Sequence, residues 1–225
     1  PKARPGDKPD FSGLEIPPPG ALPRPPVNAE AGDLSDFAYG LIRVLDAAGH
    51  ARGDWNPELD STALQRGLRA MLLTRAYDER MLRLQRQGKV SFYMKSQGEE
   101  AVAVAQAYAL DSADLLFPSY RQQGLLIARG WSLVDMMCQC FGNAADRLKG
   151  RQLPVLYSVK EAGFFSISGN LGTQYPQAVG WAMASALRGD TRIAASWIGE
   201  GATAEADFHH ALTFASVYRV PVLLN

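Results

Sequence analysis

The sequence of 225 residues is poor in the side chains that most often carry acid–base and metal chemistry. It has three histidines and two cysteines, Cys138 and Cys140. One residue separates the cysteines, so on a helix they point in different directions and we do not expect a disulfide or a metal pair. We expect both to be buried, in a protein of a reducing compartment. His209 and His210 are adjacent and lack the spacing of a metal-binding pair.

Net charge and long apolar runs are also missing. Lys and Arg together number 23, as do Asp and Glu, so no excess of positive charge favours nucleic acid as a partner. No apolar run approaches the roughly 18 residues that a membrane-spanning helix needs. We recognise no secretory signal at the start, although the sequence begins at Pro1 and an earlier targeting segment stays open. We therefore expect neither a nucleic-acid partner nor a membrane-embedded segment.

Composition divides the chain into three parts. Residues 1–33 form a proline-rich arm, because nine of the fourteen prolines lie there and exclude a helix. Residues 34–59 are rich in turn-forming residues. Residues 60–225 alternate helix-like segments with short apolar runs, which predicts an α/β fold with a parallel sheet flanked by helices. The last run, 220–224, is typical of a central strand, so we expect the domain to continue beyond the end of this sequence.

The spacing of apolar residues locates the elements of this third part. A capping box, Ser132-x-x-Asp135, indicates the start of the cysteine-containing helix. Helices are otherwise predicted at 61–87, 98–109, 174–187 and 203–218. Strands are predicted at 115–117, 192–198 and 220–224.

The most informative motif is Gly199-Glu200-Gly201, between a predicted strand and the helix at 203–218. The glycines let the backbone approach a bound group, and the free N–H groups of a helix start favour an anion. Glu200 would repel a phosphate unless a divalent cation lay between them. Mg²⁺ is commonly held in that way, by one or two carboxylates and phosphate oxygens. The motif therefore predicts a metal-bridged diphosphate site.

Two other interpretations of this turn stay open. With Ala204 it matches the loose G-x-G-x-x-G/A pattern of dinucleotide-binding turns. That pattern needs an acidic residue about 20 residues later, at the end of the next strand, and here that strand ends in Leu223-Leu224-Asn225. A tight turn from strand to helix without any ligand is the other interpretation.

Two further segments could complete a diphosphate site. Ser119-Tyr120-Arg121 follows a predicted strand, where an arginine can bind a phosphate through two N–H groups and the tyrosine hydroxyl adds a donor. The loop from Ser166 to Gln174 offers oxygens that could chelate a weakly charged cation or contact a heterocycle. A surface arginine and a capped loop without a ligand are the alternatives that the residues alone leave open.

Six motifs in order along the chain resemble one family. They are Ser91-Phe92-Tyr93-Met94, Gly98-Glu99-Glu100, Pro118 to Gln123, Lys149 to Pro154, Ser168 to Gln174, and Gly199 to Glu205. From residue 34 onward the sequence resembles the α subunits of the E1 component of branched-chain 2-oxo acid dehydrogenases (2-oxoisovalerate dehydrogenases) of the bacterial type.

The resemblance implies a thiamine-diphosphate-binding fold for residues 60–225, with Mg²⁺ and, as a further ion, K⁺. It implies oxidative decarboxylation of branched-chain 2-oxo acids, with acyl transfer to the lipoyl group of an E2 acyltransferase. The implied partner is an E1 β subunit, in an α₂β₂ heterotetramer. Such a protein would be cytoplasmic in a bacterium and would lie in the mitochondrial matrix of a eukaryote. Pyruvate or acetoin dehydrogenase α subunits, or a non-catalytic nucleotide-binding α/β subunit, are the alternatives.

The resemblance also implies roles for single residues. Glu200 would bind Mg²⁺, and the diphosphate would meet Gly201 and Ala202 on one side and Tyr120 and Arg121 on the other. The remaining positions match residues near the aminopyrimidine (Gly169, Leu171), the K⁺ ion (Ser168, Asn170, Thr173, Gln174) and the substrate (Phe92, Tyr93).

The same resemblance leaves the site incomplete within this sequence. The family signature ends in an Asn-Asn pair, which would lie beyond Asn225. The glutamate that activates the cofactor belongs to the β subunit in this family. We therefore assign no catalytic residue within the 225 residues.

Overall fold

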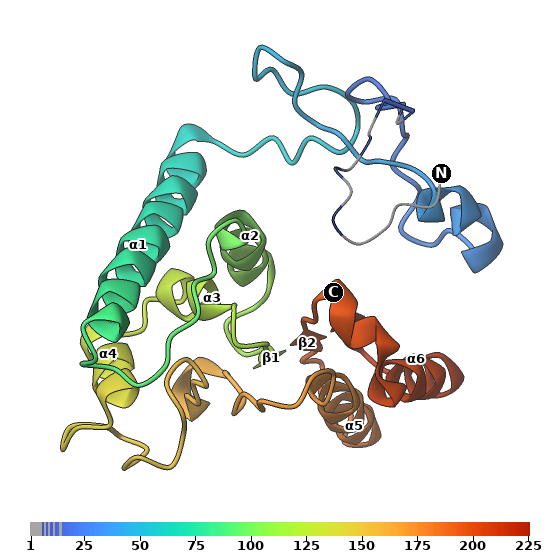
Figure 1. The fold of residues 1–225 in the computed structure, drawn as a ribbon. Coiled ribbons are helices and arrows are strands. Elements are labelled where there is room, and N and C mark those ends of the chain that lie inside the picture. Colours follow the sequence, from blue (N-terminus) through green and yellow to red (C-terminus); the bar gives the residue numbers. More distant parts are fainter. Residues whose placement is uncertain (1–5, 7, 9, 11, 14) are drawn as a thin grey trace. The chain divides into compact units, whose positions relative to one another are not determined.

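The computed structural model describes every residue except 1–5, 7, 9, 11 and 14 (Figure 1). The chain forms two compact units, Pro1–Asp60 and Ser61–Asn225. Parts of the predicted proline-rich arm lie among the residues that are not described. Within the described residues, no helix has the length and apolar character needed to cross a membrane.

The first unit consists mainly of turns. Its described residues include the 3₁₀ helix η1 (Ala31–Ala38) and an isolated antiparallel bridge between Leu45 and Ala51. The Asp46 carboxylate closes the turn within this bridge, because it accepts hydrogen bonds from the backbone N–H groups of Ala48 (3.0 Å) and His50 (2.8 Å). The proline-rich segment contacts the next part of the same unit, since the Arg43 side chain donates to the Pro17 carbonyl at 2.9 Å.

The second unit contains the helices and the sheet (Figure 1). The three strands are β1 (Leu115–Phe117), β2 (Ala194–Ser196) and β3 (Val222–Leu224). Two 3₁₀ helices, η2 (Lys160–Ala162) and η3 (Glu200–Ala204), lie in its loops. The α-helices are α1 (Ser61–Arg86), α2 (Glu100–Ala109), α3 (Gln123–Ala128), α4 (Leu133–Phe141), α5 (Gln174–Leu187) and α6 (Ala206–Tyr218).

The sheet is parallel, in the order β1-β2-β3, and is covered on both faces. Leu116 and Ala195 contribute to one core cluster with residues of α1, α3 and α4. Their neighbours Phe117 and Ala194 point to the opposite face and pack with Ala178 and Ala182 of α5. This alternation follows from the period of two in a strand, and burial on both faces is typical of parallel sheets. The predicted α/β fold is confirmed.

Several elements differ from the sequence predictions. β2 is shorter than the predicted 192–198, because the Asp190 carboxylate holds Arg192 in a turn at one end and the chain leaves the sheet after Ser196 at the other. β3, Val222–Leu224, is shorter than the predicted 220–224 and pairs with β2. The short helix α3 was not predicted.

The cysteine-containing helix α4 begins as predicted. Ser132 is its N-cap, and its hydroxyl accepts a hydrogen bond from the backbone N–H of Asp135 at 3.2 Å. Cys140 is buried, and burial raises the pKa of its thiol, although the hydrogen bond to the Tyr157 hydroxyl (3.3 Å from Sγ) opposes this. Cys138 is only half-buried. The prediction of two buried thiols is therefore right for Cys140 and wrong for Cys138, which lies on a different side of the helix.

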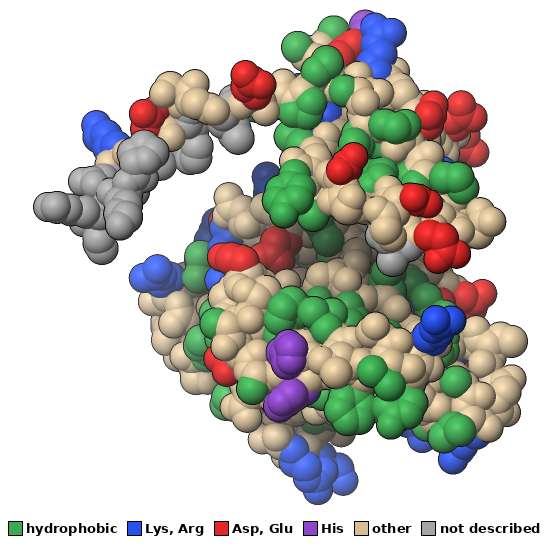
Figure 2. Space-filling view, turned by 90° about the vertical axis from the view of Figure 1, so that its right-hand side faces the viewer, with side chains coloured by type: hydrophobic (Ala, Val, Ile, Leu, Met, Phe, Trp, Pro, Cys, Tyr) green, Lys and Arg blue, Asp and Glu red, His purple; other side chains and the backbone are tan. Residues whose placement is uncertain are grey.

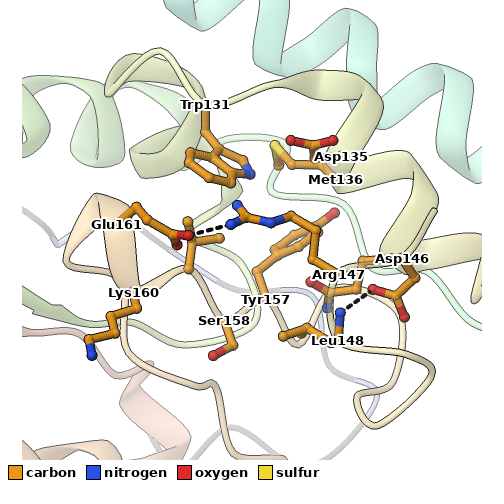
Figure 3. A pocket seen from close by; sticks show the side chains of 12 residues that line it. Trp131, Asp135, Met136, Asp146, Arg147, Leu148, Tyr157, Ser158, Lys160 and Glu161 are labelled. Carbon is orange, nitrogen blue, oxygen red and sulfur yellow. Dashed lines mark hydrogen bonds and ion pairs between the residues drawn. The ribbon is translucent and has the colours of Figure 1, made fainter.

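The loop between α4 and α5 is fixed by its own side chains. Figure 3 shows the Arg147 guanidinium beside the Trp131 ring and directed at Glu161, with which it forms an ion pair. These groups line a small pocket of about 230 Å³. The buried Asp146 carboxylate accepts hydrogen bonds from the backbone N–H groups of Leu148 and Gly150. The hydrogen bonds to Asp146 thus close the turn at 146–150, in the chain that leads to the loop before α5.

A partly buried ion pair joins α1 to α2. Arg75 Nε donates to Glu100 Oε1 at 2.8 Å, and the backbone N–H of Gly98 donates to Glu100 Oε2 at 2.9 Å. Burial by itself would raise the pKa of the Glu100 carboxyl, but these hydrogen bonds outweigh it and the pKa is lowered. Glu100 therefore stabilises the fold, as its place at a helix start suggests.

We predict that Glu100→Gln lowers the free energy of unfolding by about 1.5 kcal/mol at pH 7, since it weakens hydrogen bonds made by a charged group. A lowered pKa in the folded state gives stability that is present above the unfolded pKa and lost as the pH falls through the folded one. The difference between wild type and variant should thus shrink below about pH 4. Urea unfolding at several pH values measures this. Glu161→Gln, at an exposed ion pair, is the control and should change the free energy of unfolding little. An equal loss of stability in both variants would contradict the prediction.

Candidate functional site

A cleft of about 730 Å³ lies at the carboxyl ends of β1 and β2. Phe117 and Ser196 are directly paired, so both strands end at the same level and the loops that follow them lie close together. In open α/β sheets this edge is where ligands bind. Residues from four segments line the cleft: 97–99 before α2, 119–122 after β1, 168–174 before α5 and 198–202 after β2.

The loop after β1 presents Arg121 to the cleft. Gln122 Oε1 accepts hydrogen bonds from the Ser119 backbone N–H (2.8 Å) and hydroxyl (2.6 Å), which closes the turn. The Arg121 guanidinium lies 5.8 Å from the centre of the Tyr120 ring, and its Nη1 donates to the Lys95 carbonyl. Its other N–H groups have no acceptor among the described residues. They are therefore available to an anion in the cleft.

The loop after β2 presents Glu200. The Glu200 carbonyl accepts a hydrogen bond from the Thr203 hydroxyl at 2.6 Å, and the backbone N–H of Ala202 donates to the Gly199 carbonyl at 3.1 Å. These bonds form η3, and α6 begins only at Ala206. The prediction that the glycine turn leads directly into an α-helix is therefore wrong. Within the described part of the chain, no side chain donates a hydrogen bond to the Glu200 carboxylate.

The loop before α5 is tied to the end of β2. Gln174 is buried, and its Nε2 donates to the Trp197 carbonyl at 2.7 Å. Within the loop, the backbone N–H of Asn170 donates to the Ser168 hydroxyl (3.1 Å), and the Thr173 hydroxyl donates to the Asn170 carbonyl (3.2 Å). The Ser168 and Thr173 side chains are thus hydrogen-bonded to the backbone of their own loop.

Two carboxylates and one guanidinium set the electrostatics of the cleft. Glu99 accepts a hydrogen bond from Gln122 Nε2 at 3.2 Å. Partial burial raises the pKa of the Glu99 carboxyl, the Arg121 charge opposes this, and the negative charge of Glu200 adds to the rise. The described residues contain no group of three or more His, Cys, Asp or Glu side chains that could hold a metal ion by themselves.

The cleft brings together most of the residues that the sequence singled out. Gly169 and Thr173 lie in the loop before α5 but do not line the cleft. Phe92 is exposed, and Tyr93 is buried with its hydroxyl donating to Asp78, so neither lines it. Those that line it are Tyr120, Arg121, Ser168, Asn170, Leu171, Gln174, Glu200, Gly201 and Ala202.

Sequence reasoning missed several polar residues of the cleft. Gln97, Glu99, Ser119 and Gln122 line it, and none had an assigned role. The spacing of Ser119 and Gln122, three residues apart after a strand, could have indicated the side-chain bond that closes the turn. Nothing in the sequence indicated that Glu99 would face Glu200.

The adjacent histidines belong to a different surface. His209 and His210 of α6 are exposed, and Figure 2 shows this pair in purple among exposed hydrophobic side chains. Their ring centres are 6.3 Å apart. They do not line the cleft.

Gly172 allows the loop before α5 to turn. Its φ of +80° is in the left-handed region, and a Cβ there would lie 3.5 Å from the Glu205 Cβ, an ordinary contact. We predict that Gly172→Ala lowers the free energy of unfolding by about 1 kcal/mol, from conformational strain. Gly67→Ala, in the open middle of α1, is the matched control and should raise it by about 0.5–1 kcal/mol. Chemical unfolding measures both, and a Gly172→Ala variant as stable as wild type would contradict the prediction.

Comparisons with known proteins agree on one family. Residues 68–225 match the model of the dehydrogenase E1 component, and residues 1–32 match that of the 2-oxoisovalerate dehydrogenase E1 alpha subunit N terminal. Over its whole length the chain is 63% identical to a Pseudomonas aeruginosa 2-oxoisovalerate dehydrogenase subunit alpha, and the match covers 55% of that relative. Over 81% of its length the chain is 40% identical to the mitochondrial Homo sapiens 2-oxoisovalerate dehydrogenase subunit alpha, and the match covers 41% of that relative. The chain thus spans about half the length of these relatives.

Proposed function

This chain belongs to the dehydrogenase E1 component family, and from that premise we propose that it is the cofactor-binding part of the α subunit of a 2-oxoisovalerate dehydrogenase. The activity would be the oxidative decarboxylation of branched-chain 2-oxo acids, with the acyl group passed to a lipoyl group on E2. The observation that carries the proposal is that Glu200, after β2, and Arg121, after β1, line the same cleft.

The donor set of this cleft suits thiamine diphosphate with Mg²⁺. The Glu200 carboxylate lacks a donor among the described residues, and one carboxylate with phosphate oxygens is a common environment for Mg²⁺. The free N–H groups of Arg121 suit the diphosphate, and the Tyr120 hydroxyl adds a donor. A cation beside Glu200 would also reduce the repulsion between the Glu99 and Glu200 carboxylates.

Each loop of the cleft would have a separate task. Thiamine diphosphate supplies the electron sink for decarboxylation when it is bound. Arg121 and Tyr120 would fix the diphosphate, while Gly201 and Ala202 would meet it with backbone groups. Leu171, which is 46% exposed, and Gly169 would contact the aminopyrimidine end.

The remaining assignments follow from the family resemblance. We propose that Ser168, Asn170, Thr173 and Gln174 hold K⁺, which would order the loop before α5. Phe92 and Tyr93 are proposed neighbours of the substrate, although the Tyr93 hydroxyl is already bonded to Asp78. The activating glutamate would come from an E1 β subunit in an α₂β₂ heterotetramer. In a bacterium this assembly would be cytoplasmic.

We predict that Glu200→Ala in the complete α chain, assembled with its β subunit, lowers Mg²⁺-dependent affinity for thiamine diphosphate by more than about tenfold, or ~1.4 kcal/mol. The reason is the loss of the carboxylate ligand to the metal. Isothermal titration calorimetry with thiamine diphosphate, with and without Mg²⁺, measures the effect. Glu205→Gln is the control, since Glu205 loses the same charge but does not line the cleft. Unchanged Mg²⁺-dependent binding by Glu200→Ala would refute the metal site.

The main alternative substrate is pyruvate, because pyruvate and acetoin dehydrogenase α subunits share the cofactor motifs. The relatives named above are 2-oxoisovalerate dehydrogenase subunits, which favours the branched substrate. We predict that kcat/KM for 2-oxoisovalerate exceeds that for pyruvate by at least about tenfold, the discrimination that one or two buried carbon atoms provide. Steady-state turnover by the complete α/β enzyme tests this, and a preference for pyruvate would overturn the substrate assignment but leave the cofactor site intact.

A further inference from the structure

A carboxylate buried beside the cleft binds four donors. Asp78 lies on α1 with 0% of its surface exposed. Its Oδ1 accepts hydrogen bonds from the Tyr93 hydroxyl (2.7 Å) and from Gln123 Nε2 (2.8 Å). Its Oδ2 accepts from the backbone N–H (2.7 Å) and the hydroxyl (3.0 Å) of Ser96. The carboxylate therefore ties the segment before α2 and the start of α3 to α1.

The first route from Asp78 reaches the side chain of Arg121. Ser96 is held to Asp78 by two hydrogen bonds, so the position of the preceding residue, Lys95, is also fixed. The Lys95 carbonyl accepts a hydrogen bond from Arg121 Nη1. The guanidinium is thereby held against a backbone segment that Asp78 anchors.

The second route reaches the backbone of Arg121. Gln123 begins α3, two residues after Arg121, and is completely buried. Its Nε2 donates both to Asp78 and to the Met94 carbonyl, the latter at 3.1 Å. The peptide that carries Arg121 and the segment that receives its guanidinium are thus joined to the same carboxylate.

We propose that Asp78 is a positioning residue for the diphosphate of thiamine diphosphate, acting through Arg121, an inference that rests on the proposed function. Asp78 does not line the cleft, so it would act on the ligand without contacting it. Asp78 fixes both the backbone near Arg121 and the carbonyl that accepts a hydrogen bond from its Nη1. The guanidinium N–H groups without an acceptor would then already face the cleft when the cofactor binds. Such preorganisation reduces the ordering that binding would otherwise require.

A carboxylate is the side chain that this position needs. Four donors require two acceptor oxygens, whereas asparagine offers one oxygen and an NH₂ group that would face other donors. Asp78→Asn keeps the volume, but it leaves buried donors without acceptors on the segment before α2, on α3, or on both. The segment that receives Arg121 would then be free to shift.

A double-mutant cycle separates positioning from simple stabilisation. Thiamine diphosphate affinity is measured at saturating Mg²⁺ for wild type, Asp78→Asn, Arg121→Ala and the double variant, each as the complete α chain assembled with its β subunit. Asp78→Asn alone should weaken binding by about tenfold to hundredfold, the range expected when hydrogen bonds made by a charged group are lost. In the Arg121→Ala background the same change should cost less than about twofold, the limit of additivity. The KM for the cofactor should rise more than kcat falls.

Tyr77→Phe is the matched control. It changes another buried hydrogen-bonding side chain of α1, one residue before Asp78, whose hydroxyl contacts Tyr157 and Cys140 instead. We expect it to lower the melting temperature and to leave thiamine diphosphate affinity unchanged. If Asp78→Asn does not assemble, Ser96→Ala replaces it in the cycle, since it removes one donor and keeps the backbone bond. For Ser96→Ala, a loss of thiamine diphosphate affinity smaller than that expected for Asp78→Asn, and absent in the Arg121→Ala background, would support the proposal.

Two results would overturn the inference. One is wild-type affinity for thiamine diphosphate in the Asp78→Asn enzyme, or in Ser96→Ala where that variant replaces it, while Glu200→Ala loses affinity. The proposed function would then hold, and the role of Asp78 would not. The other is an equal loss in the wild-type and Arg121→Ala backgrounds, which would make Asp78 a structural residue only. A wild-type enzyme that binds no thiamine diphosphate would overturn the inference and the proposed function together.

Discussion

The parallel pairing of β1 with β2 is the constraint on which the rest of the second unit depends. With Phe117 opposite Ser196, the two strands end at one level and deliver Arg121 and Glu200 to the same cleft. The Ser196 hydroxyl also donates a hydrogen bond to the Phe117 carbonyl at 2.8 Å, which favours this register. The register in turn places the two loops beside the cleft.

The cleft combines opposite charges that the protein only partly neutralises. Arg121 donates one hydrogen bond to a backbone carbonyl and leaves other N–H groups without acceptors among the described residues. Burial raises the pKa of the Glu99 carboxyl, and the negative charge of Glu200, which lines the same cleft, adds to the rise. A ligand that is anionic at one end and carries its own cation matches this arrangement better than a simple anion or a bare metal ion does.

The sequence was sufficient to predict the fold class, the order of the main elements and nine of the residues that line the cleft. Glycines, carboxylates and arginines at strand ends have strong local preferences, so motifs such as Gly199-Glu200-Gly201 are visible without a structure. The start of α6 could not be predicted, because one hydroxyl, that of Thr203, stabilises η3 instead. Asp78 could not be identified either, since its donors come from three segments distant in sequence.

The burial of Asp78 has an evolutionary consequence. A residue with no exposed surface and no ligand contact is usually free to change when its neighbours repack around it. Here its two oxygens accept hydrogen bonds from Ser96, next to the carbonyl that holds the Arg121 guanidinium, and from Gln123, which follows Arg121 in the chain. Selection for cofactor affinity would then act on a side chain that the cofactor does not contact. Among relatives, Asp78, Ser96 and Gln123 should therefore be kept or exchanged as a set, together with the arginine that they support.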